Sequence, residues 1–250
     1  MACQSRNAKG ILSPVLSLII PVFNEAPNLW PLYREINEVL ARLHQAAEIL
    51  IIDDASTDRT PEVIRELKSA DPRIRGFRLQ ANSDKGGALA VGFAEARGEI
   101  FITLDGDLQN DPADIPLLLA ALEQGADLAI GWRKKRADSL MKRLSSCLFN
   151  CCVSVVFRKR LHDANTGLKA IHREVALSVP LADGLFRFFP FVLARRGLTV
   201  AEVPVHHRPR RSGRTKFRFS RRVLSLGKLP QALQTARATQ QENPPHYTAF

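Results

Sequence analysis

Two aspartates separated by a single glycine carry the clearest chemical signal in this 250-residue chain. Asp105 and Asp107 lie in the stretch TLDGDLQNDP, directly after the apolar run EIFI. Two carboxylates this close repel each other unless a cation neutralises them, and Gly106 permits backbone conformations that turn both toward one point. Hard divalent cations bind carboxylate oxygens and keep other positions for water and substrate phosphates. The stretch is therefore predicted to hold Mg²⁺ or Mn²⁺ against a diphosphate.

A lone Asp-x-Asp tripeptide is most often a solvated turn, so its surroundings decide its meaning. A second pair of carboxylates, Asp53 and Asp54, follows the apolar run EILII, and the segment PVFNE follows the apolar run LSLII. Ligands of open parallel sheets bind beyond the carboxyl ends of the strands. All three segments are therefore predicted to meet at one edge of a sheet.

Strand and helix patterns alternate along the first half of the chain, which is typical of a mostly parallel sheet covered by helices. Helices are indicated where apolar residues recur at helical spacing, and Thr60 is the expected N-cap of the second helix, with Pro61 at its first position. The segment 158–175 reads as irregular. The expected strands are 16–22, 48–54, 74–79, 99–104, 127–132 and 199–205, and the expected helices are 29–43, the one after Thr60, 87–96, 115–122 and 140–157.

The composition, with 45% hydrophobic residues and a net charge of +11, predicts a full core and an anionic partner. Residues 1–226 are expected to form a single catalytic domain, and residues 227–250 a short helix followed by a disordered tail. Nine basic and no acidic side chains lie between Arg208 and Lys228, interleaved with aromatic and aliphatic ones, which predicts a basic amphipathic segment. The four cysteines show neither metal-ligand spacing nor a disulfide framework. No apolar run reaches the roughly 20 residues needed to span a bilayer.

Several segments, in this order, are similar to the family 2 glycosyltransferases of the GT-A fold, and resemble their polyprenyl-phosphate mannose and glucose synthases. This resemblance covers about four fifths of the chain, and the joint specificity of its motifs is high. It implies an α/β fold of the Rossmann-like GT-A type. The segments are SLIIPVFNE, EILIIDDASTDRT, NSDKGGALAVGFAEARGEIFITLDGDLQNDPADIP, GWR, HDANTGLKAIHREV and VPVHHRPRRSGRTKF.

The resemblance also implies a role for each matching residue. The metal would be held by Asp105 and Asp107 with help from Gln109, and Arg133 would meet the donor phosphates. Arg210 and Lys216 match an R-x-x-G-x-[ST]-K pattern that the family places in a loop over the donor, with Gly213 as a hinge. Residues implied to line the nucleotide sugar are Pro21, Phe23, Glu25, Ile52, Asp54, Asp105, Gly106, Asp107, Arg133, Arg210 and Lys216.

Asp163, in HDANTGLKA, occupies the position of a carboxylate that the family is thought to use as a catalytic base. Physical chemistry leaves a second interpretation open. A lipid monophosphate has a second pKa of roughly 6, so its oxygen needs orientation and charge cancellation more than deprotonation. Asp163 is therefore expected to act either as the base or as a group that positions an arginine or the sugar.

The expected function is inverting, metal-dependent transfer of a hexose from a UDP- or GDP-sugar to a polyprenyl phosphate, on the cytoplasmic face of a membrane. The chain would lie on the membrane surface through the helix 140–157 and the basic segment. An oligomer and a membrane-protein partner are left open. One alternative is a family 2 enzyme with a hydroxyl acceptor, such as a polysaccharide or a lipid head group. Another is a nucleic-acid-binding protein, but the acidic strand ends would repel a phosphate backbone and no binding module is recognisable.

Overall fold

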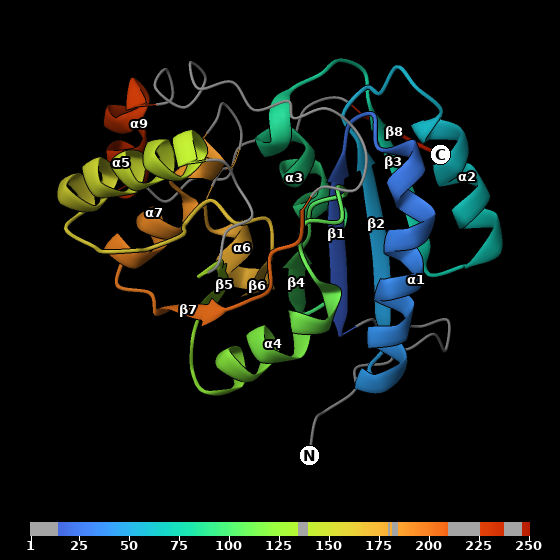
Figure 1. The fold of residues 1–250 in the computed structure, drawn as a ribbon, viewed down its shortest axis with the longest axis horizontal. Helices are drawn as coiled ribbons and strands as arrows, with labels where there is room; N and C mark the ends of the chain where they lie inside the picture. The colour runs from blue at the N-terminus through green and yellow to red at the C-terminus, as the bar shows by residue number, and fades with distance from the viewer. Residues whose placement is uncertain (1–14, 135–139, 180, 182–184, 210–225, 238–246) are drawn as a thin grey trace.

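A twisted sheet with strand order β7-β5-β6-β4-β1-β2-β3-β8 forms the centre of the molecule (Figure 1). The fold comes from a computed structural model that describes residues 15–134, 140–179, 181, 185–209, 226–237 and 247–250. Within these residues the strands are β1 (Leu16–Val22), β2 (Ala47–Asp53), β3 (Ile74–Leu79), β4 (Ile100–Thr103), β5 (Leu128–Trp132), β6 (Lys169–His172), β7 (Val200–Pro204) and β8 (Tyr247–Ala249).

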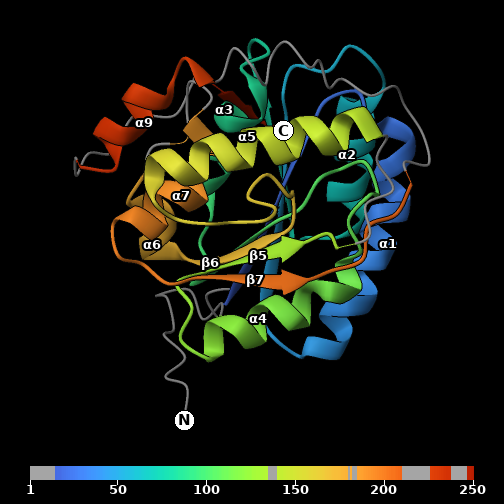
Figure 2. The same cartoon turned by 60° about the vertical axis from the view of Figure 1, so that its left-hand side comes forward.

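Helices cover both faces of this sheet. Figure 1 shows α1 and α2 together at one end of the sheet and α5, α7 and α9 at the other, and Figure 2 shows α5 and α4 on opposite sides of β5 and β7. The helices are α1 (Ala26–Leu43), α2 (Thr60–Ala70), α3 (Asp84–Glu95), α4 (Ile115–Glu123), α5 (Leu140–Phe157), α6 (Arg173–Leu177), α7 (Phe189–Arg195) and α9 (Leu229–Thr235), with 3-10 turns η1 (Pro112–Asp114) and η2 (Leu185–Arg187).

The core has two layers because successive strand side chains point to opposite faces. On β1, Leu18 and Ile20 pack with α1, α2 and α4, whereas Ile19 packs on the other face with α3 and α7. All three are at most 2% exposed, so both faces of the central strands are covered. Burying each such side chain contributes roughly 1.5–3 kcal/mol to folding. This explains why the central strands are continuous apolar runs rather than alternating ones.

Most pairings are parallel, as expected, with β1 lying between β2 and β4. The sheet departs from this at β6, which is antiparallel to both β4 and β5 and pairs Ile171 with Phe101. The expectation of irregular structure over 158–175 was therefore wrong at Lys169–His172. Only two apolar residues, Ala170 and Ile171, form its local pattern, and neighbouring strands on both sides stabilise it.

Two further expectations need correction. The tail expected to be disordered ends in β8, which pairs antiparallel with β3, with Phe77 opposite Ala249. The edge of β3 presents unpaired backbone groups, and a short added strand satisfies them. Helix α2 also begins one residue earlier than expected, because Arg59 is the N-cap and Thr60 is already helical. Asp58 Oδ1 accepts a hydrogen bond from the Thr60 amide (3.0 Å), so a residue that precedes the helix satisfies this backbone N–H at its start.

Candidate active site

The carboxyl ends of β4, β1 and β2 lie side by side, so the segments TLDGD, PVFNE and DDAS meet as predicted. Val22 is in register with Asp53, and Ile19 with Thr103. Backbone hydrogen bonds continue past the strand ends, from the Asp54 amide to the Val22 carbonyl (2.9 Å) and from the Leu104 amide to the Ile19 carbonyl (3.1 Å). This edge of the sheet positions Asp53, Asp54, Asp105 and Asp107.

Asp54 is buried at this edge and accepts hydrogen bonds from Asn82 Nδ2 (2.9 Å) and from the Ser83 amide (2.8 Å). Burial raises the pKa of Asp54 to about 6, against the lowering effect of the Ser83 amide, and the nearby Asp84 and Asp53 add to the rise. Asp54 therefore changes charge close to physiological pH. Asp53 has a different role, because its Oδ1 accepts the Ser56 amide at 2.9 Å inside the turn.

The PVFNE turn is tied to the DASTDRT loop. The Glu25 amide donates to Thr60 Oγ1 (3.0 Å), and the Glu25 carboxylate accepts from Asn28 Nδ2 (2.7 Å). Pro21 and Phe23 are half-buried at the same edge. They lie where a nucleotide could contact them.

Ile52 belongs to the core rather than to this surface. It has no exposed surface and packs among the core residues on the α3 side of the sheet. Its side chain therefore cannot line a nucleotide site as expected, and only its backbone is near the edge.

Two features determine the shape of the Asp-Gly-Asp loop: the close packing of Gly106 against β1 and the strained backbone of Leu108. A Cβ on Gly106 would lie 2.6 Å from Val22 Cγ1, so a glycine is needed because the loop runs against β1. A left-handed backbone conformation is found two residues further on, at Leu108, with φ of 61°. Leu108 is buried, and its packing holds a conformation that is costly for a residue with a Cβ.

Asp105 pairs with the Lys85 ammonium at the start of α3. Burial favours a higher pKa for Asp105, but Lys85, Lys169 and Arg133 together hold the pKa of that carboxyl below its usual range. Gly167 lies directly against it, because a Cβ there would come within 2.1 Å of Asp105 Oδ2 and 2.7 Å of Asn110 Oδ1. Asp105 and Asn110 thus converge on one side of the loop.

The residues of this loop fit a divalent cation bound mainly by its substrate. Among the described residues, no group of three or more His, Cys, Asp or Glu side chains could hold a metal alone. Asp105 and Asp107 supply two carboxylates, and the buried Asn110 Oδ1 beside Asp105 has no hydrogen-bond partner. A cation with one or two carboxylate ligands leaves room for phosphate oxygens, which is the usual Mg²⁺ arrangement.

Gln109 does not lie as expected for a metal ligand. The side-chain Nε2 of Gln109 donates a hydrogen bond to the backbone carbonyl of Arg208 (3.4 Å), and the backbone carbonyl of Gln109 accepts one from the backbone amide of Arg208 (2.9 Å). The Gln109 side chain therefore contacts the segment after β7 rather than a metal site. The Gln109 backbone amide donates a hydrogen bond to Asp107 Oδ1 (3.2 Å).

That contact is part of a larger clasp, defined here as the pairing of residues 109–114 with residues 206–208. Arg208 pairs with Asp111 (2.5 Å) and with Glu35 of α1 (2.7 Å). His206 contacts Asp114, which raises the pKa of His206 through a hydrogen bond and the attraction of the carboxylate. The clasp, which the sequence did not indicate, ties the strand-end loop to the segment after β7 and, through Arg208, to α1.

Asp163 and Arg133 form a buried ion pair. Arg133 Nε lies 2.6 Å from Asp163 Oδ2, Nη2 lies 2.9 Å from Oδ1, and the Arg133 amide also donates to Oδ2 (3.3 Å). Glu202 of β7 holds the Asp163 backbone by accepting its amide at 3.0 Å. Of the two roles left open for Asp163, this geometry favours positioning an arginine.

Lys169, like Lys85, is a cation near this loop to which the sequence assigned no role. Burial and the nearby Lys85 ammonium lower its pKa to about 7, while Asp105 and Asp163 oppose the change. Its Nζ donates to the Thr166 carbonyl. A lysine within the otherwise apolar strand β6 was a usable signal, but the strand itself was not recognised.

Arg210, Gly213 and Lys216, expected to close over the donor, lie outside the described residues, as does most of the basic segment. The described part of the chain contains no helix both long and apolar enough to cross a membrane. At the end of α5, Val155 is 73% exposed and is followed by exposed Arg158, Lys159 and Arg160.

Comparison with known proteins was made on sequence and on structure. Residues 17–169 match the sequence family described as Glycosyl transferase family 2. Undecaprenyl-phosphate 4-deoxy-4-formamido-L-arabinose transferase of Salmonella choleraesuis (strain SC-B67) is 33% identical over 224 residues, which cover 88% of this chain and 68% of that protein.

Two solved structures are similar in fold. Mannosyl-3-phosphoglycerate synthase from Rubrobacter xylanophilus aligns with a TM-score of 0.68 and 19% identity, covering 92% of this chain and 78% of that one. Glucosyl-3-phosphoglycerate synthase from Mycobacterium tuberculosis, in complex with Mn²⁺ and uridine-diphosphate-glucose, aligns with a TM-score of 0.62 and 18% identity, covering 95% and 86%.

Proposed function

The chain belongs to glycosyl transferase family 2, and from that premise we propose that it transfers one sugar from a nucleotide diphosphate sugar to a polyprenyl phosphate. In this reaction the bond between the sugar C1 and the donor diphosphate oxygen breaks. A bond from C1 to an oxygen of the lipid phosphate forms on the opposite face, with inversion. The nucleotide diphosphate leaves.

The name of the Salmonella relative supports the acceptor, since that protein is an undecaprenyl-phosphate transferase and is similar over most of this chain. The Mycobacterium synthase, solved with Mn²⁺ and a UDP-sugar, supports a nucleotide sugar and a divalent cation. Asp105 and Asp107 would hold the cation, which supplies Lewis-acid stabilisation of the leaving diphosphate.

The main observation that supports the proposal is the group of basic side chains around the carboxylate loop. Lys85, Lys169 and Arg133 all act on Asp105 or lie beside it. A phosphate nucleophile approaching a diphosphate needs such charge to overcome repulsion, whereas a hydroxyl nucleophile needs a base. The candidate base, Asp163, already has both carboxylate oxygens bonded to Arg133. The arrangement therefore suits a phosphate acceptor better than a hydroxyl.

We place the nucleotide at the β1 and β2 ends, with Asp54 toward the base and Pro21, Phe23 and Glu25 around it. The protein would work as a peripheral enzyme on the cytoplasmic face of a membrane. Exposed Val155 and Val156 at the end of α5, beside the basic stretch 158–160, suit contact with an anionic lipid surface. Residues 1–226 would form the catalytic unit.

The test is a transfer assay with purified protein. A short polyprenyl phosphate is incubated with labelled UDP- and GDP-sugars, with Mg²⁺, Mn²⁺ or chelator, and label entering the organic phase is counted. We expect metal-dependent transfer from one donor. A protein that transfers sugar to hydroxyl acceptors and never to polyprenyl phosphate would overturn the acceptor assignment.

A further inference from the structure

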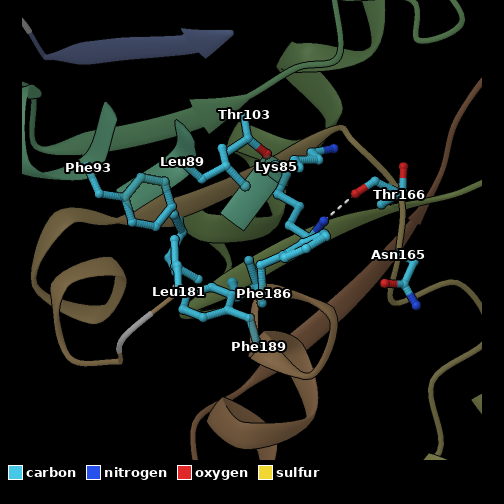
Figure 3. A pocket seen from close by; sticks show the side chains of 12 residues that line it. Lys85, Leu89, Phe93, Thr103, Asn165, Thr166, Leu181, Phe186 and Phe189 are labelled. Atoms are coloured by element: carbon cyan, nitrogen blue, oxygen red, sulfur yellow. Dashed lines mark hydrogen bonds between the residues drawn. The ribbon is translucent and has the colours of Figure 1, made fainter. Parts of the chain in front are cut away.

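A mostly apolar pocket opens next to the Asp-Gly-Asp loop and is not used by the roles assigned so far (Figure 3). Its walls come from α3, from the sheet and from the segment leading into α7. Figure 3 shows the aromatic rings of Phe93, Phe186 and Phe189 gathered around it with Leu89 and Leu181. Leu128 and Ile171 of β5 and β6 complete the apolar lining.

Figure 3 shows Lys85, Asn165 and Thr166 at the end of this pocket away from Phe93 and Leu181. Lys85 and Lys169 line it together with Thr103, Asn165 and Thr166. Lys85 pairs with Asp105, so this end of the pocket adjoins the carboxylate loop. Within the described part of the chain, no carboxylate lies within ion-pair distance of Lys169, whose ammonium donates to the Thr166 carbonyl.

Thr166 contributes a further polar group to this part of the pocket. Its side chain is 1% exposed, and its hydroxyl has no hydrogen-bond partner among the described residues. A buried hydroxyl without a partner is costly, which is why such groups commonly meet a ligand or water. An oxyanion at the mouth of the pocket could accept from Thr166 and face both ammonium groups.

The chemistry of the lining indicates which substrate of the proposed reaction could bind in this pocket. A hexose placed deep in the pocket would bury hydroxyls against Phe93, Phe189 and Leu128 with no partners. The nucleotide base belongs at the other side of the loop, near Asp54. Only the acceptor joins an anionic head to a hydrocarbon chain, and its first isoprene unit is branched and apolar.

We propose that this pocket receives the first isoprene unit of the polyprenyl phosphate, with the phosphate held at its mouth by Lys85, Lys169 and Thr166. This assignment rests on the proposed function and deepens it. The phosphate is thereby placed beside the carboxylate loop that holds the donor diphosphate.

The experiment compares two leucine-to-phenylalanine changes on helices. Leu89→Phe fills the proposed pocket from α3, whereas Leu32→Phe fills a second apolar cavity under α1, away from the site. Both changes overpack the core to a similar degree. Binding of farnesyl phosphate and of inorganic phosphate is measured by calorimetry, together with KM for the polyprenyl phosphate and for the donor.

We expect Leu89→Phe to weaken farnesyl phosphate binding and raise the acceptor KM by at least about tenfold, with the donor KM and inorganic phosphate binding unchanged. Leu32→Phe should leave all four quantities at their original values. Lys169→Met should weaken both phosphate and farnesyl phosphate by about tenfold, and Lys169→Arg should restore most of that loss. Circular dichroism of each variant confirms that it is folded.

The possible outcomes test the pocket assignment independently of the proposed reaction. If the parent protein transfers sugar to polyprenyl phosphate while Leu89→Phe binds farnesyl phosphate like the parent, the pocket assignment is wrong and the proposed function stands. If Leu89→Phe fails to fold, Ile171→Phe, which fills the same pocket from β6, decides the question by the same measurement. If no polyprenyl phosphate accepts sugar but farnesyl phosphate still binds and Leu89→Phe weakens it, the transfer proposal is wrong and the lipid-phosphate site stands.

Discussion

Arg133 and Asp163 face each other edge to edge, with Nε 2.6 Å from Oδ2 and Nη2 2.9 Å from Oδ1, in a pair whose side chains are 12% and 4% exposed. A bidentate pair of this kind fixes the plane of the guanidinium. Because both carboxylate oxygens are bonded, Asp163 is better placed to aim Arg133 than to remove a proton. Three elements support the pair: the end of β5, the loop before β6 and Glu202 of β7.

A positioning role for Asp163 predicts a modest kinetic effect. An asparagine can accept only one of the two guanidinium bonds, so Asp163→Asn should lower kcat/KM about tenfold, near 1.4 kcal/mol. Removal of a true base would instead cost about 10²- to 10⁴-fold and would change the acidic limb of the pH profile. Steady-state kinetics from about pH 5 to about pH 9 distinguish the two roles.

The same pair predicts strong coupling between substitutions. Removing either partner of a buried ion pair strands a charge and costs about 3–5 kcal/mol of stability. The double variant Arg133→Met with Asp163→Leu should therefore be more stable than the sum of the single changes implies. Urea unfolding of the four proteins measures this, and additive effects would mean that the pair is not formed in solution.

Asp107→Asn should nearly abolish turnover, by about 10³-fold or more, because the change removes the negative charge of one of the two carboxylates that would bind the cation. Mn²⁺ binding, followed by electron paramagnetic resonance with the nucleotide diphosphate present, should weaken in parallel. Glu123→Gln, an exposed change on α4, is the control and should behave like the parent. Activity of Asp107→Asn within a few-fold of the parent would remove Asp107 from the metal site.

The raised pKa of Asp54, about 6, predicts pH-dependent nucleotide binding. If the ionised carboxylate accepts hydrogen bonds from the base, affinity for the nucleoside diphosphate should rise as pH increases through about 6 and then level off. The folded protein holds this proton more tightly than the unfolded chain, so the contribution of Asp54 to stability should fall as the pH rises from about 4, near the pKa of a free aspartate, to about 6. Calorimetric titrations of the parent and of Asp54→Asn, which should lack the step, check both the size and the origin of the effect.

Gly167→Ala should damage the site more than the fold. The added Cβ would come within 2.1 Å of Asp105 Oδ2 and must displace that carboxylate, which should reduce Mn²⁺ affinity and activity by about 10²-fold. The control is Gly125→Ala, which has φ of 95° and no neighbour within 4 Å. That change strains the turn before β5 and should cost about 1 kcal/mol of stability with activity retained. Equal loss of activity in both variants would point to general destabilisation.

Much of the fold could be predicted because its signals are local and repeated. The runs at 16–22 and 74–79 match β1 and β3 residue for residue, and the helix at 140–157 matches α5. The placement of Asp54, Asp105 and Asp107 at one edge of the sheet also followed from the pattern, because parallel strands bring their carboxyl ends to the same edge. Strands β6 and β8 escaped prediction, since each is short and depends on the backbone of a neighbour for its stability.

Sequence alone therefore determined the fold class, the family resemblance and the position of the carboxylates at the strand ends. Tertiary structure decided what each of these residues touches. The pairing of Lys85 with Asp105, of Asp163 with Arg133 and of Arg208 with Glu35 joins positions 20, 30 and 173 residues apart. Such pairings leave no periodic trace in the sequence, because the energy of an ion pair depends on distance and burial in the folded chain rather than on local propensity.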